Sequence, residues 1–587
     1  MSDTPIIIIG AGPAGLAAGY ELVGQGKRTI IIERDGVVGG IARTESYKGF
    51  SFDIGGHRFF TQNARINQIW EDMLGEDFLR VDRLSRIFYQ GKFFNYPLRP
   101  VNAFYNLGPW ESLLILISYF RARLLPHPVE SSFEDWVINR FGERLYRTFF
   151  KIYTEKVWGL SCREIKADWA AQRIKGLSLL VAVSNALFGG QQAKSLIGRF
   201  SYPKLGPGMM WNRFMERIIA GGGEVMLNSA VSALHHDRGI ITAVSFNGVS
   251  ASGQFIPAHC ISSMPLPRLV KLLNPQPPAE IIAAAEKLSY RAFIIVILII
   301  DAPDLFPDQW LYVHSPTVQV GRIQNFKNWS AFMVPDQRKT SIGMEYFCNE
   351  NDETWTMTDS QLVEMASREL RALSLGGEHS VSDSYVVRQP FAYPVYGPDY
   401  RENVEKICKY LRNFSNLQTI GRSGMHRYNN MDHSMQTGIL AARNCCGETH
   451  DLWTVNEEKS YLEEDRRAQA GVLPEKVLLR AFARMDKLGF AVAVGTVCGL
   501  MVLSATFWII SRGGDVQNSH LRLLGQYFIG YTVTVKGGFI AFAYSFFWGF
   551  LFGWLFAYLR NLLLAIYIYR IKRKIEMLSL KDFFDNF

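Results

Sequence analysis

The chain has 587 residues, a net charge of +9, and 48 % hydrophobic against 20 % charged residues. A single hydrophobic core rarely serves this length, so we expect several domains. The basic excess does not indicate a nucleic-acid partner, because no basic helix or nucleic-acid motif occurs and many lysines and arginines flank apolar segments; membrane contact explains the charge better. Seven scattered cysteines, with neither CxxC spacing nor a histidine at zinc-ligand spacing, predict reduced cytosolic thiols and no metal site.

The N-terminal residues form a βαβ pattern. An apolar run at residues 5–9 meets the turn "GAGPAG", a helical pattern follows, and "RTIIIE" is a second apolar strand. The turn supplies Gly10, Gly12 and Gly15, which allow close approach of a pyrophosphate to a helix N-terminus. Glu33, at the end of the second strand, can accept ribose hydroxyls. The pattern predicts a dinucleotide-binding domain, and the absence of a basic and apolar leader predicts that it stays in the cytoplasm.

The predicted secondary structure changes twice in the middle of the chain. Residues 61–195 look mainly helical, with a capping-box pattern at Ser132 and Asp135, and we interpret them as a helical insertion. Residues 266–404 contain β-rich stretches such as "RAFIIVILIID", which predict a substrate-side sheet. The charged residues 451–486 resemble a helical linker. The dinucleotide-binding domain is then discontinuous and consists of residues 1–60, 196–265 and 405–450.

Residues 487–587 contain two long apolar stretches. Leu488–Ile510 and Gly537–Leu559 have no charged residue, and a helix of this length crosses a hydrocarbon core of about 30 Å. Positive charges are denser outside the pair than between its members, so we predict a membrane hairpin with both ends and the following tail in the cytoplasm. A buried hairpin of a soluble domain is the alternative, disfavoured by aromatic residues all round the second stretch. Gly549 and Gly553 form a GxxxG motif that permits close approach of the two helices or of two protomers.

The stretch after Glu33, "RDGVVGGIART", resembles the second glycine pair of the flavin-containing amine oxidase superfamily. The resemblance implies FAD as the cofactor. It also implies an α/β FAD-binding domain of the glutathione-reductase-like Rossmann type, to which the patterns above add a helical insertion, a β-rich substrate domain and the two-helix membrane anchor. No second glycine fingerprint occurs, so NAD(P)H or another reductant, where needed, comes from solution. The implied phosphate contacts extend to Arg34, Gly39, Gly40 and Arg43.

Four further motifs, in order along the chain, resemble UDP-galactopyranose mutase, a family within that superfamily. They are "GFSFDIGGHRFF", "YTEKVWG", "FAYPVY" and "GRSGMHRYNNMD", and the resemblance covers most of residues 5–445. In that family the N5 atom of reduced flavin attacks the anomeric carbon of a nucleotide sugar and carries the sugar while its ring opens and recloses. The resemblance therefore implies interconversion of pyranose and furanose forms without net redox change.

The mutase resemblance also assigns roles to individual residues. Gly55, Gly56 and His57 would lie at the flavin, where His57 tunes N5 or packs beside it, with a structural turn as the alternative. Asp432 matches the acidic residue that binds flavin, and an ordinary helix N-cap is compatible with that role. Core packing is the alternative for the aromatic residues among the substrate positions. The matched phosphate contacts are Arg291, Tyr393, Arg422 and Tyr428, and the matched uracil pocket is Phe149, Phe150, Tyr153 and Trp158.

Two features depart from the mutase family. The stretch "CISSMPLPRLVKLLNP" looks more like the protoporphyrinogen-oxidase pattern, and "NNMDHS" leaves Asn429, Asn430 and His433 without a role. The predicted membrane hairpin is a further departure, because typical mutases of this family are soluble. We expect a mutase at the cytoplasmic face of a bacterial inner membrane, acting on a nucleotide- or polyprenyl-linked sugar for surface polysaccharide synthesis, with homo-oligomerisation compatible. The alternatives are an FAD-dependent oxidoreductase, protoporphyrinogen-oxidase-like or desaturase-like, on a lipophilic substrate, and a membrane scaffold with a relic FAD fold.

Overall fold

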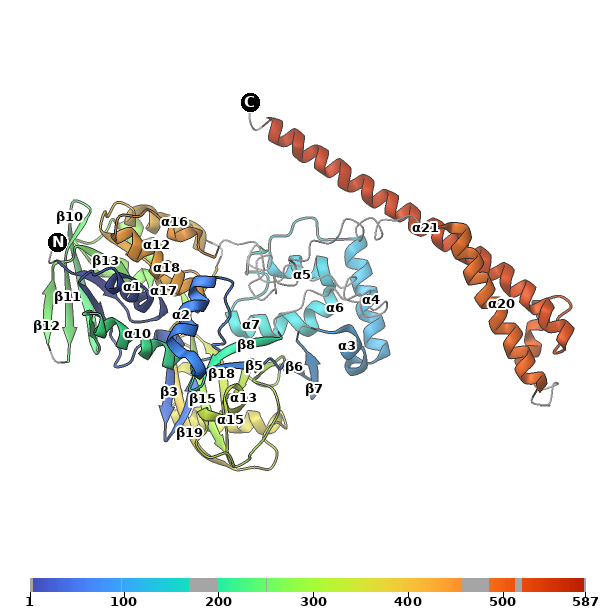
Figure 1. Cartoon of the computed structure of the whole chain (residues 1–587), viewed down its shortest axis with the longest axis horizontal. Helices are drawn as coiled ribbons and strands as arrows, with labels where there is room; N and C mark the ends of the chain where they lie inside the picture. The colour runs from blue at the N-terminus through green and yellow to red at the C-terminus, as the bar shows by residue number, and fades with distance from the viewer. Residues whose placement is uncertain are drawn as a thin grey trace. The chain divides into compact units, whose positions relative to one another are not determined.

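The protein divides into two compact units, Met1–Asp465 and Arg466–Phe587, each of which is described by itself (Figure 1). The computed structural model describes residues 4–96, 98–167, 198–249, 251–397, 399–456, 485–511 and 520–584. Most of the predicted helical linker therefore lies outside the described residues. All seven cysteines are free thiols.

A five-stranded parallel sheet organises the first half of the larger unit. Its central strands are runs of isoleucine buried on both faces, as parallel sheets covered by helices require. Helix α1 (Pro13–Gly24) packs against α18 (Met431–Cys445) and α10 (Gly208–Ala220), which lie close together in Figure 1. In spatial order the strands are β20 (Leu417–Thr419), β13 (His259–Ser262), β1 (Ile6–Ile9), β2 (Thr29–Ile32) and β9 (Glu224–Met226).

A seven-stranded sheet forms the second half of this unit. Its strand β15 (Tyr290–Ile300), next to one edge, is buried and apolar and pairs antiparallel with both neighbours. Helix α15 (Asp359–Ala372) packs on this sheet. In spatial order the strands are β19 (Val381–Pro394), β15, β18 (Thr340–Cys348), β17 (Arg322–Asn325), β16 (Trp310–Val313), β6 (Ser85–Tyr89) and β7 (Lys92–Asn95).

Strands β6 and β7 come from the stretch that the sequence predicted as mainly helical. They form a hairpin because Gln90 and Gly91 both have positive φ, +49° and +72°, as a two-residue turn of type I′ requires. The same stretch also supplies β5 (Phe78–Asp82), which pairs with β8 (Arg199–Pro203). The predicted helical insertion therefore contains three strands, β5, β6 and β7, after its first helix, α2 (Ala64–Leu74).

The other described helices of the predicted insertion follow β5, β6 and β7. The capping box at Ser132 is present: its hydroxyl accepts a hydrogen bond from the amide of Asp135 at 3.1 Å, and it begins α5. A π-helical segment at Tyr146–Lys151 then leads into α7. The helices are α3 (Pro100–Leu107), α4 (Pro109–Leu124), α5 (Phe133–Phe141), α6 (Glu143–Leu145) and α7 (Ile152–Trp158).

Smaller elements complete the larger unit. A four-stranded sheet contains β12 (Ser252–Phe255), β11 (Ile240–Gly248), β10 (Ser229–Asp237) and β14 (Leu273–Asn274), and a separate hairpin pairs β3 (Thr44–Tyr47) with β4 (Phe50–Asp53). Among the described residues of this unit, the remaining helices of six or more residues are α2 (Ala64–Leu74), α11 (Leu266–Leu272), α12 (Ala279–Glu286) and α16 (Tyr400–Leu411).

The smaller unit contains two long apolar helices, α20 (Lys487–Ser511) and α21 (Val535–Phe584). Residues Lys487–Ser511 and Val535–Leu562, with mean hydropathy 2.1 and 1.7, are long and apolar enough to cross a membrane. A Cβ atom added to Gly549 would lie 3.0 Å from the Cα of Gly495, and one added to Gly553 would lie 3.0 Å from the Cα of Ala491. The GxxxG motif therefore brings the two helices of the hairpin together.

A buried carboxyl ends β4, directly before the loop that carries His57. Asp53 is almost fully buried and accepts hydrogen bonds from the hydroxyls of Tyr202 and, at 2.8 Å, of Thr44. Burial raises the pKa of Asp53 to about 7, although both hydrogen bonds oppose the shift. The folded state thus retains a proton on Asp53 that the unfolded chain releases near pH 4.

We expect Asp53→Asn to remove part of the pH dependence of stability. Because the pKa of Asp53 is raised in the folded state, protonated Asp53 contributes to the free energy of unfolding. This contribution is complete below about pH 4 and is lost as the pH rises through about 7, with a slope of up to about 1.4 kcal/mol per pH unit. Urea unfolding of the purified protein at several pH values should show a shallower decline for Asp53→Asn than for the wild type. The exposed Asp237→Asn is the control, and identical slopes for all three proteins would contradict the assignment.

Candidate functional site

A cavity of about 1220 Å³ lies in the larger unit. The first parallel sheet contributes its glycine turn and the edge at Glu33, and the seven-stranded sheet contributes Arg322 and Tyr393. The loop at residues 54–60 and the start of α18 close the space between them. The cavity thus joins the predicted dinucleotide cradle to the predicted substrate side.

The glycine turn leaves open space at the N-terminus of α1. Gly10 has a φ of +99°, and a Cβ atom on Gly15 would lie 1.9 Å from the carbonyl oxygen of Gly10, so both positions require glycine. A Cβ atom on Gly12 would meet only the Cα of Gly40, at 3.9 Å. Gly12 and Gly40 therefore lie against each other at the cavity wall, where the lack of side chains lets a pyrophosphate approach the amides and positive dipole of the helix N-terminus.

Glu33 lies where an adenosine ribose would be held. Its carboxylate accepts hydrogen bonds from the amides of Ala11, at 2.6 Å, and Asp35, at 2.9 Å. Burial raises its pKa against the effect of these bonds. Each carboxylate oxygen has a second lone pair with which it can accept a ribose hydroxyl. The backbone thus fixes Glu33 at the cavity wall in a position suited to that task.

Of the other residues around the second glycine pair, some line the cavity and some support the turn from behind. Arg43 lines the cavity and donates hydrogen bonds to Glu45, at 2.6 Å, and to the carbonyl of Gly40, at 3.1 Å. Arg34 also lines it, with its guanidinium at Asp35. Gly39 does not line the cavity; its φ is +106°, and an added Cβ atom would lie 2.6 Å from Trp211. Gly15 likewise supports the turn from behind.

His57 lines the cavity together with Gly55 and Gly56. Its Nδ1 lies 3.1 Å from the carbonyl oxygen of Gly55, so this nitrogen carries the proton and Nε2 remains an acceptor. Burial and the nearby charges of Arg422 and Arg322 lower the pKa of His57 to about 3. The imidazole is therefore neutral at physiological pH.

Asp432 lies in the first turn of α18, with Asn430 as the N-cap. Asp432 is thus not the N-cap that the sequence allowed. Its side chain is buried, and among the described residues its Oδ1 has no hydrogen-bond partner, although His433 Nδ1 lies 3.7 Å away. A buried carboxylate oxygen requires a donor, and the helix dipole favours its charge here. A hydroxyl or N–H group of a flavin suits this position.

Asn429, Asn430 and His433, which the sequence left without a role, stabilise the loop before α18. The side chain of Asn429 donates a hydrogen bond to the carbonyl of Gly421 at 3.3 Å, and its Oδ1 accepts one from Asn456 at 3.0 Å. The backbone amide of Asn430 donates to His433 Nδ1 at 3.3 Å. These contacts hold the chain between Arg422 and Asp432 in shape.

Two arginines and two tyrosines converge on the opposite wall of the cavity. The rings of Tyr393 and Tyr428 stack with centroids 5.8 Å apart, and the guanidinium of Arg422 lies 4.5 Å from the centroid of Tyr428. Arg322 forms an ion pair with the fully buried Glu345, and its Nη2 donates a hydrogen bond to the hydroxyl of Tyr393 at 2.8 Å. This constellation is suited to bind a phosphate or diphosphate.

The sequence did not single out Arg322. A signal was nonetheless present, because "VGRIQNF" places one arginine in a short strand and "GMEYF" places one glutamate in the next strand along the chain. Charges inside a sheet must be paired, and β17 and β18 place Arg322 directly opposite Glu345.

Arg291, expected to contact phosphate, does not line the cavity. It is buried, its Nη2 donates to the carbonyl of Phe347 at 2.9 Å, and its Nη1 lies 3.6 Å from the carboxylate of Asp352. The end of α7 covers it, because a Cβ atom on Gly159 would lie 2.4 Å from its guanidinium carbon. Arg291 therefore supports the packing behind the site, and Arg322 occupies the place expected of it.

The four aromatic residues expected at a uracil also lie behind the wall. Phe149 packs in the core of the insertion, and Phe150 stacks on Phe141. Tyr153 stacks on His314 with centroids 4.9 Å apart. Trp158 contacts the rings of Tyr393, Tyr396 and Tyr428, which do line the cavity. Tyr153 and Trp158 thus back the aromatic wall, and neither lines the described cavity.

The family described as flavin containing amine oxidoreductase matches residues 13–446 of the chain. The chain belongs to this family. Membership implies a flavin cofactor, and the open glycine cradle, Glu33 and the unpartnered oxygen of Asp432 fit one.

The chain is similar to proteins with different activities. It is 30 % identical over 177 residues to the protein named "Probable UDP-galactopyranose mutase" of Klebsiella pneumoniae, which is 29 % of this chain and 44 % of that relative. It is 23 % identical over 316 residues to a 4,4'-diapophytoene desaturase of Methylomonas sp, covering 46 % and 57 %. A reduced UDP-galactopyranose mutase structure shares the fold with a TM-score of 0.69 and 22 % identity, over 79 % of this chain and 98 % of that one. The two sequence relatives are thus matched over about half of their length.

We expect Gly12→Val and Gly15→Val to fail in different ways. The space beside Gly12 is open, so valine there should leave the folded apoprotein intact but lower its flavin content at least about tenfold by blocking the helix N-terminus. Valine at Gly15 would collide with the carbonyl of Gly10 and should prevent folding. Flavin absorbance per protein and circular dichroism measure both effects. A Gly12→Val protein with full flavin content would contradict the placement of the cradle.

Proposed function

We propose that the protein is an FAD-dependent mutase that interconverts the pyranose and furanose forms of a phosphate- or diphosphate-linked sugar. The observation that carries this proposal is the convergence of Arg322, Arg422, Tyr393 and Tyr428 on the cavity that also contains the flavin cradle. An enzyme that only oxidises a hydrocarbon has no use for two guanidinium groups there. A sugar diphosphate requires both.

The chain's own residues would bind and orient the substrate. Arg322 is positioned by Glu345 and Arg422 by the carbonyl of Asn429, at 2.8 Å, so both guanidinium groups are in place before substrate binds. Charge-assisted contacts gain strength in a partly dry cavity. FAD, when bound and reduced, would supply the nucleophile for the anomeric carbon. Neutral His57 would lie beside it as a hydrogen-bond acceptor without adding positive charge.

The cradle for FAD would consist of Gly10, Gly12, Gly40 and Arg43, supported from behind by Gly15 and Gly39. Glu33 would lie at the ribose of FAD and Asp432 at its flavin end. We further propose that α20 and α21 anchor the enzyme in a membrane with both termini in the cytoplasm. Anchoring favours a substrate that is itself held in the bilayer, so a polyprenyl carrier is proposed alongside a nucleotide. The product would enter synthesis of a surface polysaccharide.

An FAD-dependent oxidoreductase on a lipophilic substrate is the second candidate. The relative named as a desaturase and the two apolar helices favour it. The two candidates differ in whether substrate transfers electrons to the flavin and leaves it reduced.

An anaerobic reaction separates these functions. With chemically reduced enzyme, polyprenyl-phosphate or UDP-linked galactose should change ring form, as measured by chromatography of the released sugar, while the flavin stays reduced. With oxidised enzyme the same sugars should leave the flavin spectrum unchanged. Stoichiometric bleaching of oxidised flavin by substrate would exclude the mutase and favour the oxidoreductase.

Removal of the cavity arginine Arg422 should weaken substrate binding more than flavin binding. We expect Arg422→Ala to weaken substrate binding by about 3 kcal/mol, about a hundredfold, while flavin content changes little. The KM of the reduced enzyme and flavin absorbance measure the two effects, and Arg422→Lys should recover part of the affinity. The exposed Arg338→Ala is the control. Equal loss of flavin and substrate would assign Arg422 to the cofactor.

A further inference from the structure

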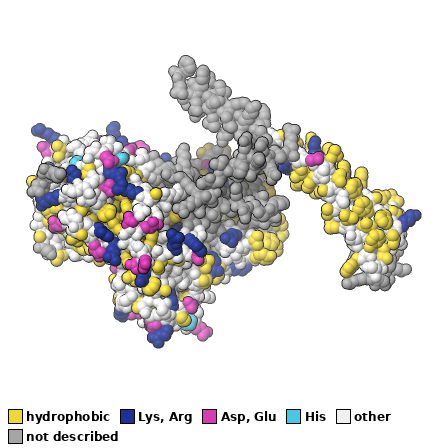
Figure 2. All heavy atoms as spheres, in the orientation of Figure 1, with side chains coloured by type: hydrophobic (Ala, Val, Ile, Leu, Met, Phe, Trp, Pro, Cys, Tyr) yellow, Lys and Arg dark blue, Asp and Glu magenta, His cyan; other side chains and the backbone are white. Residues whose placement is uncertain are grey.

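Helices α3 and α4 present an apolar surface to solvent. The α3–α4 face, as we name it, contains Tyr105, Trp110, Leu113, Ile117, Phe120 and Leu124. Trp110 and Leu124, near the two ends of α4, are 70 % and 80 % exposed. Figure 2 shows hydrophobic side chains gathered where Figure 1 places these helices.

Helix α4 is apolar on two sides. Ile115, Tyr119 and Ala122 face the core of the insertion and are buried, while the exposed residues recur at spacings of three and four along the other side. A helix between a core and water normally carries polar residues on its outer side. A contiguous apolar outer side indicates a binding partner.

The charges around the face indicate what that partner is. Arg99, Arg121 and Arg123 are exposed beside it. Between residues 98 and 129 the sequence has one acidic residue, Glu111, and Arg144 binds both of its carboxylate oxygens, at 2.5 and 2.7 Å. An apolar strip edged by arginines, with tryptophan and tyrosine among its residues, matches the interface of a bilayer that contains anionic lipids.

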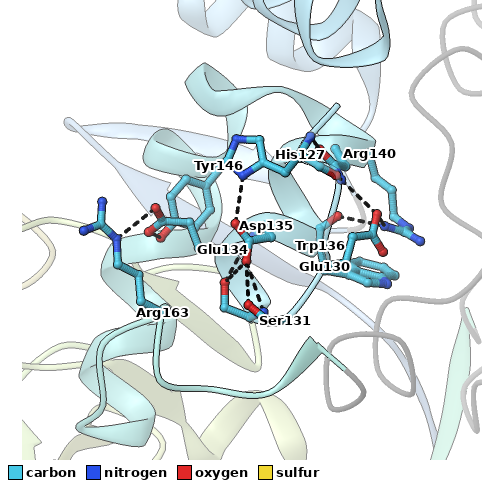
Figure 3. A network of polar contacts seen from close by, with 11 residues as sticks. His127, Glu130, Ser131, Glu134, Asp135, Trp136, Arg140, Tyr146 and Arg163 are labelled. Carbon is cyan, nitrogen blue, oxygen red and sulfur yellow. Dashed lines mark hydrogen bonds and ion pairs between the residues drawn. The ribbon is translucent and has the colours of Figure 1, made fainter. Parts of the chain in front are cut away.

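A polar network fixes the segment that follows α4 (Figure 3). His127 Nδ1 lies 2.8 Å from Asp135, and Arg140 donates a hydrogen bond to Glu130 at 2.6 Å. The amide of His127 also donates to Asn139 at 2.8 Å. These contacts tie the chain after α4 to α5, so the face is held against the insertion in one orientation.

The face also begins close to the cavity. Tyr96 lines the cavity, its ring packs against Tyr312 with centroids 4.8 Å apart, and α3 starts at Pro100. The start of α3 is thus only a few residues along the chain from Tyr96 in the cavity wall.

We propose that the α3–α4 face docks on the surface of an anionic bilayer and brings the cavity to substrates carried by lipids. The inference rests on the proposed membrane anchoring, and it is independent of whether the reaction is a mutase or an oxidoreductase reaction. A second copy of the chain, or another segment of this chain, is the competing occupant of the face.

Photo-crosslinking in vesicles tests the contact. The photoreactive residue benzoyl-phenylalanine replaces Ile117, on the face, or Val249, an exposed residue of the larger unit outside it, or Phe547, exposed on α21. The full chain is reconstituted in vesicles of phosphatidylcholine and phosphatidylglycerol, illuminated and analysed by peptide mass spectrometry. We expect lipid adducts at 117 and 547, at a yield at least about tenfold above that at 249.

The crosslinking outcomes distinguish docking of the α3–α4 face from anchoring by α20 and α21. Adducts at 547 without adducts at 117 would overturn the docking and leave the anchor in place, whereas adducts at neither would overturn both. Crosslinks from 117 to a peptide of this chain or of a second copy would identify the competing occupant and also overturn the docking.

Charge reversal gives a second readout. The double variant Arg121→Glu with Arg123→Glu should lower the lipid-adduct yield at 117 at least about tenfold in vesicles with phosphatidylglycerol, and much less in phosphatidylcholine alone. Arg238→Glu, at an exposed arginine outside the face, is the matched control and should have no effect. An unchanged yield in the double variant would overturn the role of anionic lipid.

Discussion

The ion pair between Arg322 and Glu345 determines what the cavity can bind. Glu345 is fully buried and also accepts a hydrogen bond from Gln324 at 2.8 Å, so its charge is satisfied from two sides. A buried ion pair contributes little net stability, because desolvation offsets the attraction. Its value here is positional: it holds one guanidinium at the cavity wall and leaves its Nη2 to orient the hydroxyl of Tyr393. Without Glu345 a buried cation would stand alone in the sheet.

The same charges act across the cavity on the flavin side. Burial lowers the pKa of His57, and Arg422 and Arg322 lower it further, so that a neutral imidazole lies next to the space for the flavin. The loop that carries His57 follows Asp53, whose buried carboxyl ties β4 to Tyr202. Gln324 lies behind this loop, 3.1 Å from the position of a Cβ atom on Gly56. The arginines that we propose to bind substrate thus also affect the electrostatics beside the space for the flavin.

Local patterns predicted the cofactor side of the site better than the substrate side. The βαβ unit, the glycine turn and Glu33 lie close together in sequence, and steric rules fix their geometry. Arg322 was missed because its pairing with Glu345 was not recognised in the sequence, and Arg291 was misplaced because its environment depends on contacts with the distant residues Phe347 and Gly159. The hairpin of β6 and β7 was overlooked because its turn, Gln90 and Gly91, lacks the usual asparagine or aspartate. The roles of Asn429, Asn430 and His433 likewise became clear only from their contacts in the folded loop.

The distribution of apolar surface supports a membrane setting by two separate observations. In the hairpin, glycines direct α20 and α21 against each other, and large residues on the outer sides of both helices, such as Trp508 and Phe547, remain exposed. In the larger unit, α4 exposes a second apolar strip beside arginines. An anchor alone needs only the hairpin, because two helices suffice to retain a protein at a bilayer. A second lipid-facing surface on the unit that holds the cavity would serve a different end, which we propose is to bring the cavity close to substrates carried by lipids.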